Sequence, residues 1–212
     1  MKKLQLLLLV LLPTFLLAQP GPPCPTAIDS FPTEINFDAG LSTPITPVPG
    51  AVFWNYGPNH PNGTPSFQTG PSAGVSKTGS FVFTEASGQS PNTWYAFQTE
   101  CFNVDNNPGM ELSFFYHMYG SAMGSLEVFI IEADTLTGDT TEFFTLSGDQ
   151  GNLWQYAVFD LDSIGVSGDF YLQFHGYRGP NYQSDMSIDN VRIGPPLVMT
   201  YGCTDTLALN YD

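Results

Sequence analysis

Histidines and acidic residues are the side chains of this 212-residue sequence that could do chemistry. The three histidines, His60, His117 and His175, do not form the H-E-x-x-H helix motif that binds zinc in metalloproteases. The stretch GSAMG at 120–124 lacks the central serine of a hydrolase nucleophile elbow. His117 and His175 lie in strand-like runs, where a histidine bonded to a neighbour is more common than a general base. We therefore expect no catalytic residue in this chain.

The 20 acidic residues favour cation binding over hydrolysis. Many acid pairs share a strand face, and we interpret them as solvated carboxylates rather than as a glycosidase pair. A hard cation such as Ca²⁺ takes about six to eight oxygen ligands from carboxylates and carbonyls. Asp38 ends the first expected strand, Asp189 and Asn190 lie in the last, and the loop TGPSAG at 69–74 could add carbonyls. Glu85 is a weaker candidate ligand, because strand alternation could equally turn its side chain to solvent.

The first residues and the charge indicate an exported, acidic protein. Lys2 and Lys3 precede an apolar run that ends at Ala18, which predicts a secretory signal peptide over residues 1–18. The remaining chain has three strong bases against 20 acidic residues, a formal charge of −17. We expect no nucleic-acid partner and no membrane insertion of the mature chain.

The three cysteines, Cys24, Cys101 and Cys203, cannot all pair within one chain. In an exported protein we expect a Cys24–Cys101 disulfide that ties a proline-rich arm (19–33) to the domain, with Cys203 left over. A Cys101–Cys203 bond, with the C-terminal tail folded back, is the alternative.

Short apolar or alternating runs between Gly, Pro, Asn and Asp clusters predict a β domain over 34–194. The number and spacing of these runs favour a two-sheet antiparallel β-sandwich. The region 40–79 has few strand signals and predicts a long irregular loop. The expected strands are 34–37, 80–86, 93–102, 111–118, 125–133, 142–146, 153–161, 169–177 and 185–193.

Alternation along 111–118 separates a core face from an amphipathic face. We expect four side chains in the core, those of Leu112, Phe114, Tyr116 and Met118.

Aromatic residues also raise the possibility of sugar binding, although core packing explains the three tryptophans more simply. The best exposed candidates for ligand binding are Tyr177, Arg178 and Tyr182. Arg178 is one of only three bases in the mature chain, so an internal pair with a carboxylate such as Asp185 is the first expectation for it.

Several spaced motifs together resemble a MAM domain, the extracellular module of meprin, a neuropilin-type receptor and a receptor tyrosine phosphatase. They are LSFFYHMYGSAMGSLEV, LSGDQGNLWQ and FYLQFHGYRGPNYQSDMSIDNVRI, supported by NFDAG, TGPSAG and FVFTEAS, over roughly residues 34–194. The resemblance implies a jelly-roll β-sandwich that mediates adhesion or oligomerisation and has no catalysis of its own. It also implies acids placed like Asp38 and Asp189, whereas Gly74 stands where the family often has a further aspartate.

The sequence departs from the family at three cysteine positions, where it has Ile35, Ser42 and Glu111. The disulfides of the animal domains are therefore absent. After residue 194, the linker and truncated motif (195–212), with GCTD at 202–205, resemble segments between domains of secreted bacterial surface proteins. We thus expect a non-catalytic adhesion module, secreted or at the cell surface, at the N-terminus of a larger bacterial protein. Its expected partner is a surface protein, a glycan or a second copy of the chain, with structural Ca²⁺. The alternative is a carbohydrate-binding module that targets an enzyme encoded further along the chain.

Overall fold

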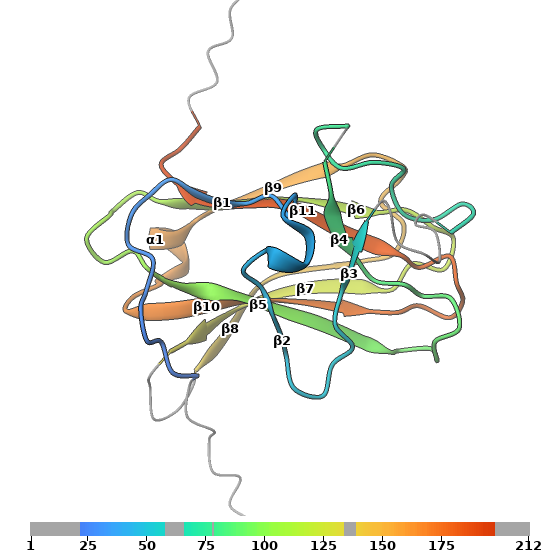
Figure 1. The fold of residues 1–212 in the computed structure, drawn as a ribbon, viewed down its shortest axis with the longest axis horizontal. Coiled ribbons are helices and arrows are strands. Elements are labelled where there is room, and N and C mark those ends of the chain that lie inside the picture. Colours follow the sequence, from blue (N-terminus) through green and yellow to red (C-terminus); the bar gives the residue numbers. More distant parts are fainter. Residues whose placement is uncertain (1–21, 58–65, 78, 134–138, 198–212) are drawn as a thin grey trace, which may run out of the picture.

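The computed structural model describes residues 22–57, 66–77, 79–133 and 139–197. Its strands form two antiparallel sheets, one of six strands and one of five. Figure 1 shows the sheets as two stacked layers, with β11 and β6 in the upper layer and β5 and β10 in the lower. The expected all-β, jelly-roll antiparallel sandwich is confirmed.

The six-stranded sheet has the order β3-β4-β11-β6-β9, and β1 also pairs with β11. Its long central strands are rich in aromatic and β-branched residues, which favour the pleated, half-buried surface of a sheet. The strands are β1 (Thr33–Ile35), β3 (Asn55–Gly57), β4 (Phe81–Phe83), β6 (Glu111–Met118), β9 (Gln155–Asp160) and β11 (Met186–Gly194).

The five-stranded sheet has the order β2-β5-β10-β7-β8. All of its pairings are antiparallel, and the ladders are shifted at bulges in β5–β10 and in β7–β8. The strands are β2 (Thr46–Pro47), β5 (Trp94–Asn103), β7 (Ser125–Glu132), β8 (Thr140–Ser147) and β10 (Asp169–Tyr177).

Alternate residues of both sheets fill the space between them with aromatic rings. Phe114 is fully buried, and its ring lies 5.2 Å from Phe174 and 5.5 Å from Phe144 between centroids. Phe174 in turn stacks on Phe97 at 4.8 Å. Such pairs add specific contacts to the large apolar area that each ring buries. The expectation for 111–118 holds for Leu112, Phe114 and Met118, whereas Tyr116 is only partly buried.

Four short elements were missing from the predicted set. The stretch 40–79 contains β2, β3 and a 3-10 turn, η1 (Gly40–Ser42). A four-residue helix, α1 (Leu161–Ile164), follows β9. Asp160 caps it by accepting hydrogen bonds from the amides of Asp162 and Ser163, and Gly165 ends it with φ 81°.

The N-terminal arm runs along one end of the sandwich, from the five-stranded sheet up to β1 in the other layer (Figure 1). Ile28 pairs with Phe102 in a parallel bridge, and the Ile28 amide donates to the Cys101 carbonyl at 2.8 Å. The arm therefore joins both layers of the sandwich. In the part of the chain that is described, no helix has the length and apolar character needed to cross a membrane. The expected signal peptide, His60 and Cys203 lie outside the described residues.

Candidate functional site

The two described histidines are both held by side-chain amides. His117 Nε2 lies 3.1 Å from Asn152 Oδ1, and His175 Nε2 lies 2.9 Å from Gln173 Oε1. Burial lowers the pKa of each imidazole to about 4, so both rings are neutral at physiological pH. Neither amide is a nucleophile that these rings could activate.

Asp38 and Asp189 converge on the loop 74–80. Asp38 Oδ1 accepts from the Ser80 amide at 2.8 Å, and Asp189 Oδ2 accepts from the Val75 amide at 2.9 Å. A Cβ on Gly74 would lie 3.1 Å from Asp189 Oδ2 and 2.8 Å from the Gly79 carbonyl oxygen. The two carboxylates thus lie beside the same loop, to which this carbonyl belongs.

Asp189 is almost fully buried in this cluster. Burial raises its pKa to about 6, two backbone hydrogen bonds oppose that rise, and the charges of Asp38 and Glu34 add to it. A buried carboxylate beside a second acid and a backbone carbonyl supplies oxygen ligands of the kind that a hard cation prefers, in place of the backbone amides that donate to both carboxylates here. The residues present therefore fit a calcium ion. Asn190, the other predicted ligand, has a left-handed backbone with φ 49°, and its amide donates to Asp189 Oδ1 at 2.8 Å, so this contact holds the carboxylate and does not ligate a cation.

Glu85 lies away from this cluster, which corrects the expectation that it could join the same ligand set. In the β4–β11 ladder Val82 is opposite Ile188, so residue 85 falls opposite residue 185 rather than 189. Four residues along a strand correspond to about 13 Å. Glu85 is nearly buried there, its Oε1 accepts from the Ser87 amide at 2.8 Å, and its Oε2 has no hydrogen-bond partner among the described residues.

The prediction that Arg178 is an exposed ligand-binding side chain is also wrong. Only 7 % of it is exposed, so a ligand has little access to the guanidinium. Its Nε donates to the Ala86 carbonyl at 2.7 Å and its Nη1 to the Gly179 carbonyl at 3.0 Å. Asp185, the expected partner, instead accepts from the Ala86 amide at 2.8 Å.

The other two predicted ligand residues, Tyr177 and Tyr182, lie in different structural settings. Tyr182 is 43 % exposed at a loop tip, beside Gln183, whose Nε2 donates to Gln68 Oε1 at 3.2 Å. Tyr177 is partly buried in β10, on the outer face of the five-stranded sheet. Burial raises the pKa of Tyr177, and the charges of Glu127 and Glu142 raise it further. The structure therefore does not join Tyr177, Arg178 and Tyr182 into one site.

The outer face of the five-stranded sheet carries a side-chain array that includes the predicted residue Tyr177 and that the sequence alone did not assemble. On this face Trp94, Tyr177 and Ser125 stand in one cross-strand row, and Gln98 pairs with Gln173 in another. The Trp94 and His175 rings lie 5.3 Å apart, and the Phe129 and His175 rings 4.6 Å apart. Alternation in β5 and β10 was visible in the sequence, but only the strand register brings these side chains together.

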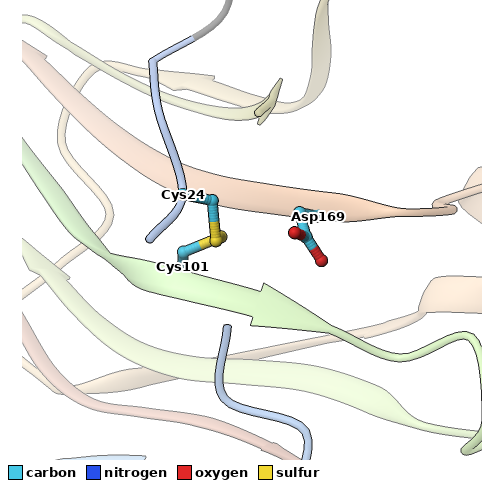
Figure 2. Close-up of side chains that lie close together, drawn as sticks. All are labelled: Cys24, Cys101 and Asp169. Carbon is cyan, nitrogen blue, oxygen red and sulfur yellow. A yellow bond between two sulfur atoms is a disulfide. The ribbon is translucent and has the colours of Figure 1, made fainter. Parts of the chain in front are cut away.

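The arm is attached to the same sheet by the Cys24–Cys101 disulfide, which is formed in the structure (Figure 2). Asp169 lies close by, and its carboxylate and the two sulfur atoms fall within 4.8 Å of one another. Sulfurs in a disulfide are not thiolates and cannot ligate a metal as a Cys site does. Asp169 instead accepts from Asn103 Nδ2 at 2.6 Å. This trio is thus structural.

Comparison with known proteins places this chain in a family. A family model described as "MAM domain, meprin/A5/mu" matches residues 51–203, which is more than half of the chain. The chain belongs to the MAM domain family. The predicted family is therefore confirmed, and the MAM domain is an extracellular adhesion-type module.

Two relatives and one solved structure show how far the similarity extends. The chain is 43 % identical over 82 residues to human MAM domain-containing glycosylphosphatidylinositol anchor protein 1, covering 39 % of this chain but 8 % of that protein. It is 35 % identical over 94 residues to MAM and fibronectin type III domain-containing protein 1 of the coral Acropora millepora, covering 44 % and 19 %. Its fold is similar to the K1 cleaved adhesin domain of Lys-gingipain from Porphyromonas gingivalis W83, with a TM-score of 0.55 and 15 % identity over 79 % of this chain and 99 % of that chain.

Proposed function

We propose that this MAM domain is a non-catalytic extracellular adhesion or interaction module within a larger secreted or surface protein of bacterial type. The family match over residues 51–203 carries the proposal. The human relative agrees with a modular role, because the region matched by this chain spans only 8 % of that protein. We assign residues 1–18 to a signal peptide, 19–33 to the arm, 34–194 to the module and 195–212 to a linker and the start of a further motif.

The non-catalytic part of the proposal is supported by the state of the histidines. Both imidazoles are neutral and bonded to amides, so neither is paired with a serine, threonine or cysteine that it could deprotonate. Surface recognition needs no such pair. It needs side chains that rigid strands hold in place, and the five-stranded sheet provides them.

The module takes calcium as a structural ion. Asp38 and Asp189 would hold it with the Gly79 carbonyl, and the ion would neutralise the buried charge of Asp189. The cation then ties β11 and the segment after β1 to the loop 74–80. It supplies stability rather than chemistry.

An adhesion assay tests the proposed function. Fluorescent beads coated with the full chain are applied, with millimolar calcium, to arrays of extracellular proteins and glycans, and substrate turnover is measured on the same surfaces. We expect saturable binding without turnover. Turnover that His117→Ala or His175→Ala abolishes in a folded protein would overturn the non-catalytic assignment.

A second candidate function is a carbohydrate-binding module that targets an attached enzyme. The observation in its favour is the aromatic and amide array on the outer face of the five-stranded sheet. In this reading the module has the same non-catalytic role, and its partner is a polysaccharide instead of a protein.

A further inference from the structure

The outer face of the five-stranded sheet is ordered in rows by the strand register. One row holds Trp94, Tyr177, Ser125 and Ser147, the next Ala96, His175, Glu127 and Thr145, and the third Thr46, Gln98, Gln173, Phe129 and Glu142. A fourth row, with Cys101, Tyr171 and Ile131, lies under the N-terminal arm. The arm also borders Thr46 and Gln98 at one end of the third row, and on the remaining surface Trp94, His175 and Tyr177 are partly exposed.

Aromatic rings on this face are fixed in place by their neighbours. His175 lies between Trp94 and Phe129, with centroid distances of 5.3 and 4.6 Å. Ala96 is the small residue beside His175 in the same row. Rings held by backbone ladders lose little conformational freedom when a ligand binds, which favours affinity.

A hydrogen-bonded chain of amides crosses the same face. Gln173 Nε2 donates to Gln98 Oε1 at 2.8 Å, and Gln173 Oε1 faces His175 Nε2 at 2.9 Å. Because His175 is neutral and Gln173 Oε1 only accepts, this contact assigns the ring proton to Nε2 and leaves Nδ1 as an acceptor. The face thus offers both donors and acceptors in a fixed arrangement.

The charge of the face decides which ligand it suits. Glu127 lies in the row next to that of Tyr177, and Glu142 lies in the third row. The described bases are elsewhere: Arg178 is buried, Arg192 is in β11 of the other sheet, and Lys77 lines a hollow beside Trp154. An anionic ligand would meet carboxylates without a compensating cation, whereas hydroxyl groups can donate to carboxylates and amides.

A pocket closes one end of this face. It has a volume of about 360 Å³ and lies between the arm and the edge strand β2, lined by Pro25, Thr26, Thr46, Gln98, Glu100 and Tyr171. Gln98 belongs to both the pocket and the third row. The disulfide and the hydrogen bond from the Tyr171 hydroxyl to the Pro23 carbonyl hold the arm as a wall. A pocket of this size is within the range of small-molecule sites, about 300–1,000 Å³.

We infer that the outer face of β5, β10 and β7 binds an uncharged glycan chain, whose terminal sugar enters the pocket between the arm and β2. Sugar rings stack on the aromatic side chains, and their hydroxyls bond to the amide chain and to Glu127 and Glu142. This inference rests on the proposed recognition function and names its ligand class.

Calorimetric titration of the full chain tests this site. The probes are uncharged oligosaccharides of six sugars (cello-, manno-, galacto- and chito-hexaose), with hexagalacturonate as the anionic comparison. At least one uncharged probe should bind, and Tyr177→Ala and Thr46→Trp should each weaken it at least tenfold, the second by filling the pocket. Tyr156→Ala is the matched control, because Tyr156 is 44 % exposed in β9 of the other sheet. It should leave affinity unchanged.

The outcomes separate this inference from the proposed function. Binding of hexagalacturonate alone, or equal affinity loss in Tyr177→Ala and Tyr156→Ala, overturns the glycan site. If no oligosaccharide binds but coated beads still adhere to a protein surface, the glycan inference fails and the adhesion function stands. Circular dichroism and melting of each variant confirm that it is folded.

Discussion

Arg178 and Asp185 both hydrogen-bond to the backbone of Ala86, one to its carbonyl and the other to its amide. The Arg178 Nε donates to the Ala86 carbonyl at 2.7 Å, and the Ala86 amide donates to Asp185 Oδ1 at 2.8 Å. The segment after β4 is thereby fastened to the connection between β10 and β11. Both side chains are thus committed to the fold and are not available to a ligand.

Asp185 should make stability depend on pH. Burial raises its pKa to about 7, and the charge of Glu85 adds to the rise. A raised carboxyl pKa favours the protonated folded state, so its contribution is fully present below about pH 4 and is lost as pH rises towards 7. In chelator, the difference in the free energy of unfolding between wild type and Asp185→Asn should fall over this window, by on the order of 1.4 kcal/mol per pH unit. The difference is the quantity to measure, because the lowered pKa values of His117 and His175 make stability rise with pH in both proteins.

Asp185→Asn isolates this contribution, since the amide does not ionise. Asp29→Asn, in the exposed part of the arm, is the control and should keep the wild-type slope. Equal slopes in wild type and Asp185→Asn would show that the carboxylate does not carry the effect. Asp189 shifts in the same direction and the two histidines in the opposite one, and these contributions are the same in wild type and in Asp185→Asn.

Phe114→Ala should lower the free energy of unfolding by about 3–5 kcal/mol, because it leaves a cavity among rings that cannot collapse fully. Phe114 is 0 % exposed and contacts Phe144, Phe159 and Phe174. Val158→Ala, on the outer face of β9, should change stability by less than about 0.5 kcal/mol. Chemical denaturation measures both variants, and a small cost for Phe114→Ala would contradict the core assignment.

Calcium should stabilise the chain through Asp38 and Asp189. A ligand that binds only the folded state adds about 2.7 kcal/mol at a hundredfold excess over Kd. The Tm should therefore rise with millimolar calcium and fall with chelator, and Asp189→Ala should lose most of the response. Asp29→Ala should keep it. An unchanged Tm and no heat on titration would leave Asp38 and Asp189 as acceptors of backbone hydrogen bonds only.

Replacing both Cys24 and Cys101 with serine should cost about 2–4 kcal/mol, because the crosslink closes a loop between residues 77 positions apart. Non-reducing peptide mapping identifies the bond directly. Recovery of a Cys101–Cys203 peptide would mean that the C-terminal tail competes with the arm for Cys101.

The strands could be predicted because their alternation is strong. The loops that pack over the outer faces of the strands could not be predicted. In β6, Leu112, Phe114 and Met118 are buried as their spacing predicts. Ser113 and His117 on the opposite face are buried as well, which alternation alone does not indicate. Trp154 donates to the Ala73 carbonyl at 2.9 Å and packs against His117, so a distant loop covers this face.

The short elements had weaker signals. β2 and β3 have two and three residues, too few for a periodic pattern. Helix α1 could have been found, because Asp160 and Gly165 bracket it with capping residues. At the candidate sites, the convergence of Asp38 and Asp189 could be predicted from their positions in the first and last strands, while their role as calcium ligands stays a prediction. Arg178 and Glu85 were not, because burial in a loop cluster depends on contacts with distant residues.

The most direct test of the account is bead adhesion by matched tyrosine variants. Beads carrying wild-type chain, Tyr177→Ala or Tyr156→Ala are applied to the surface or glycan that the wild type binds, and the fraction retained is counted. Tyr177→Ala should lose most of the retention, and Tyr156→Ala should keep it. Full retention by Tyr177→Ala, with loss in Tyr156→Ala, would contradict recognition by the five-stranded sheet and would move it to the other sheet.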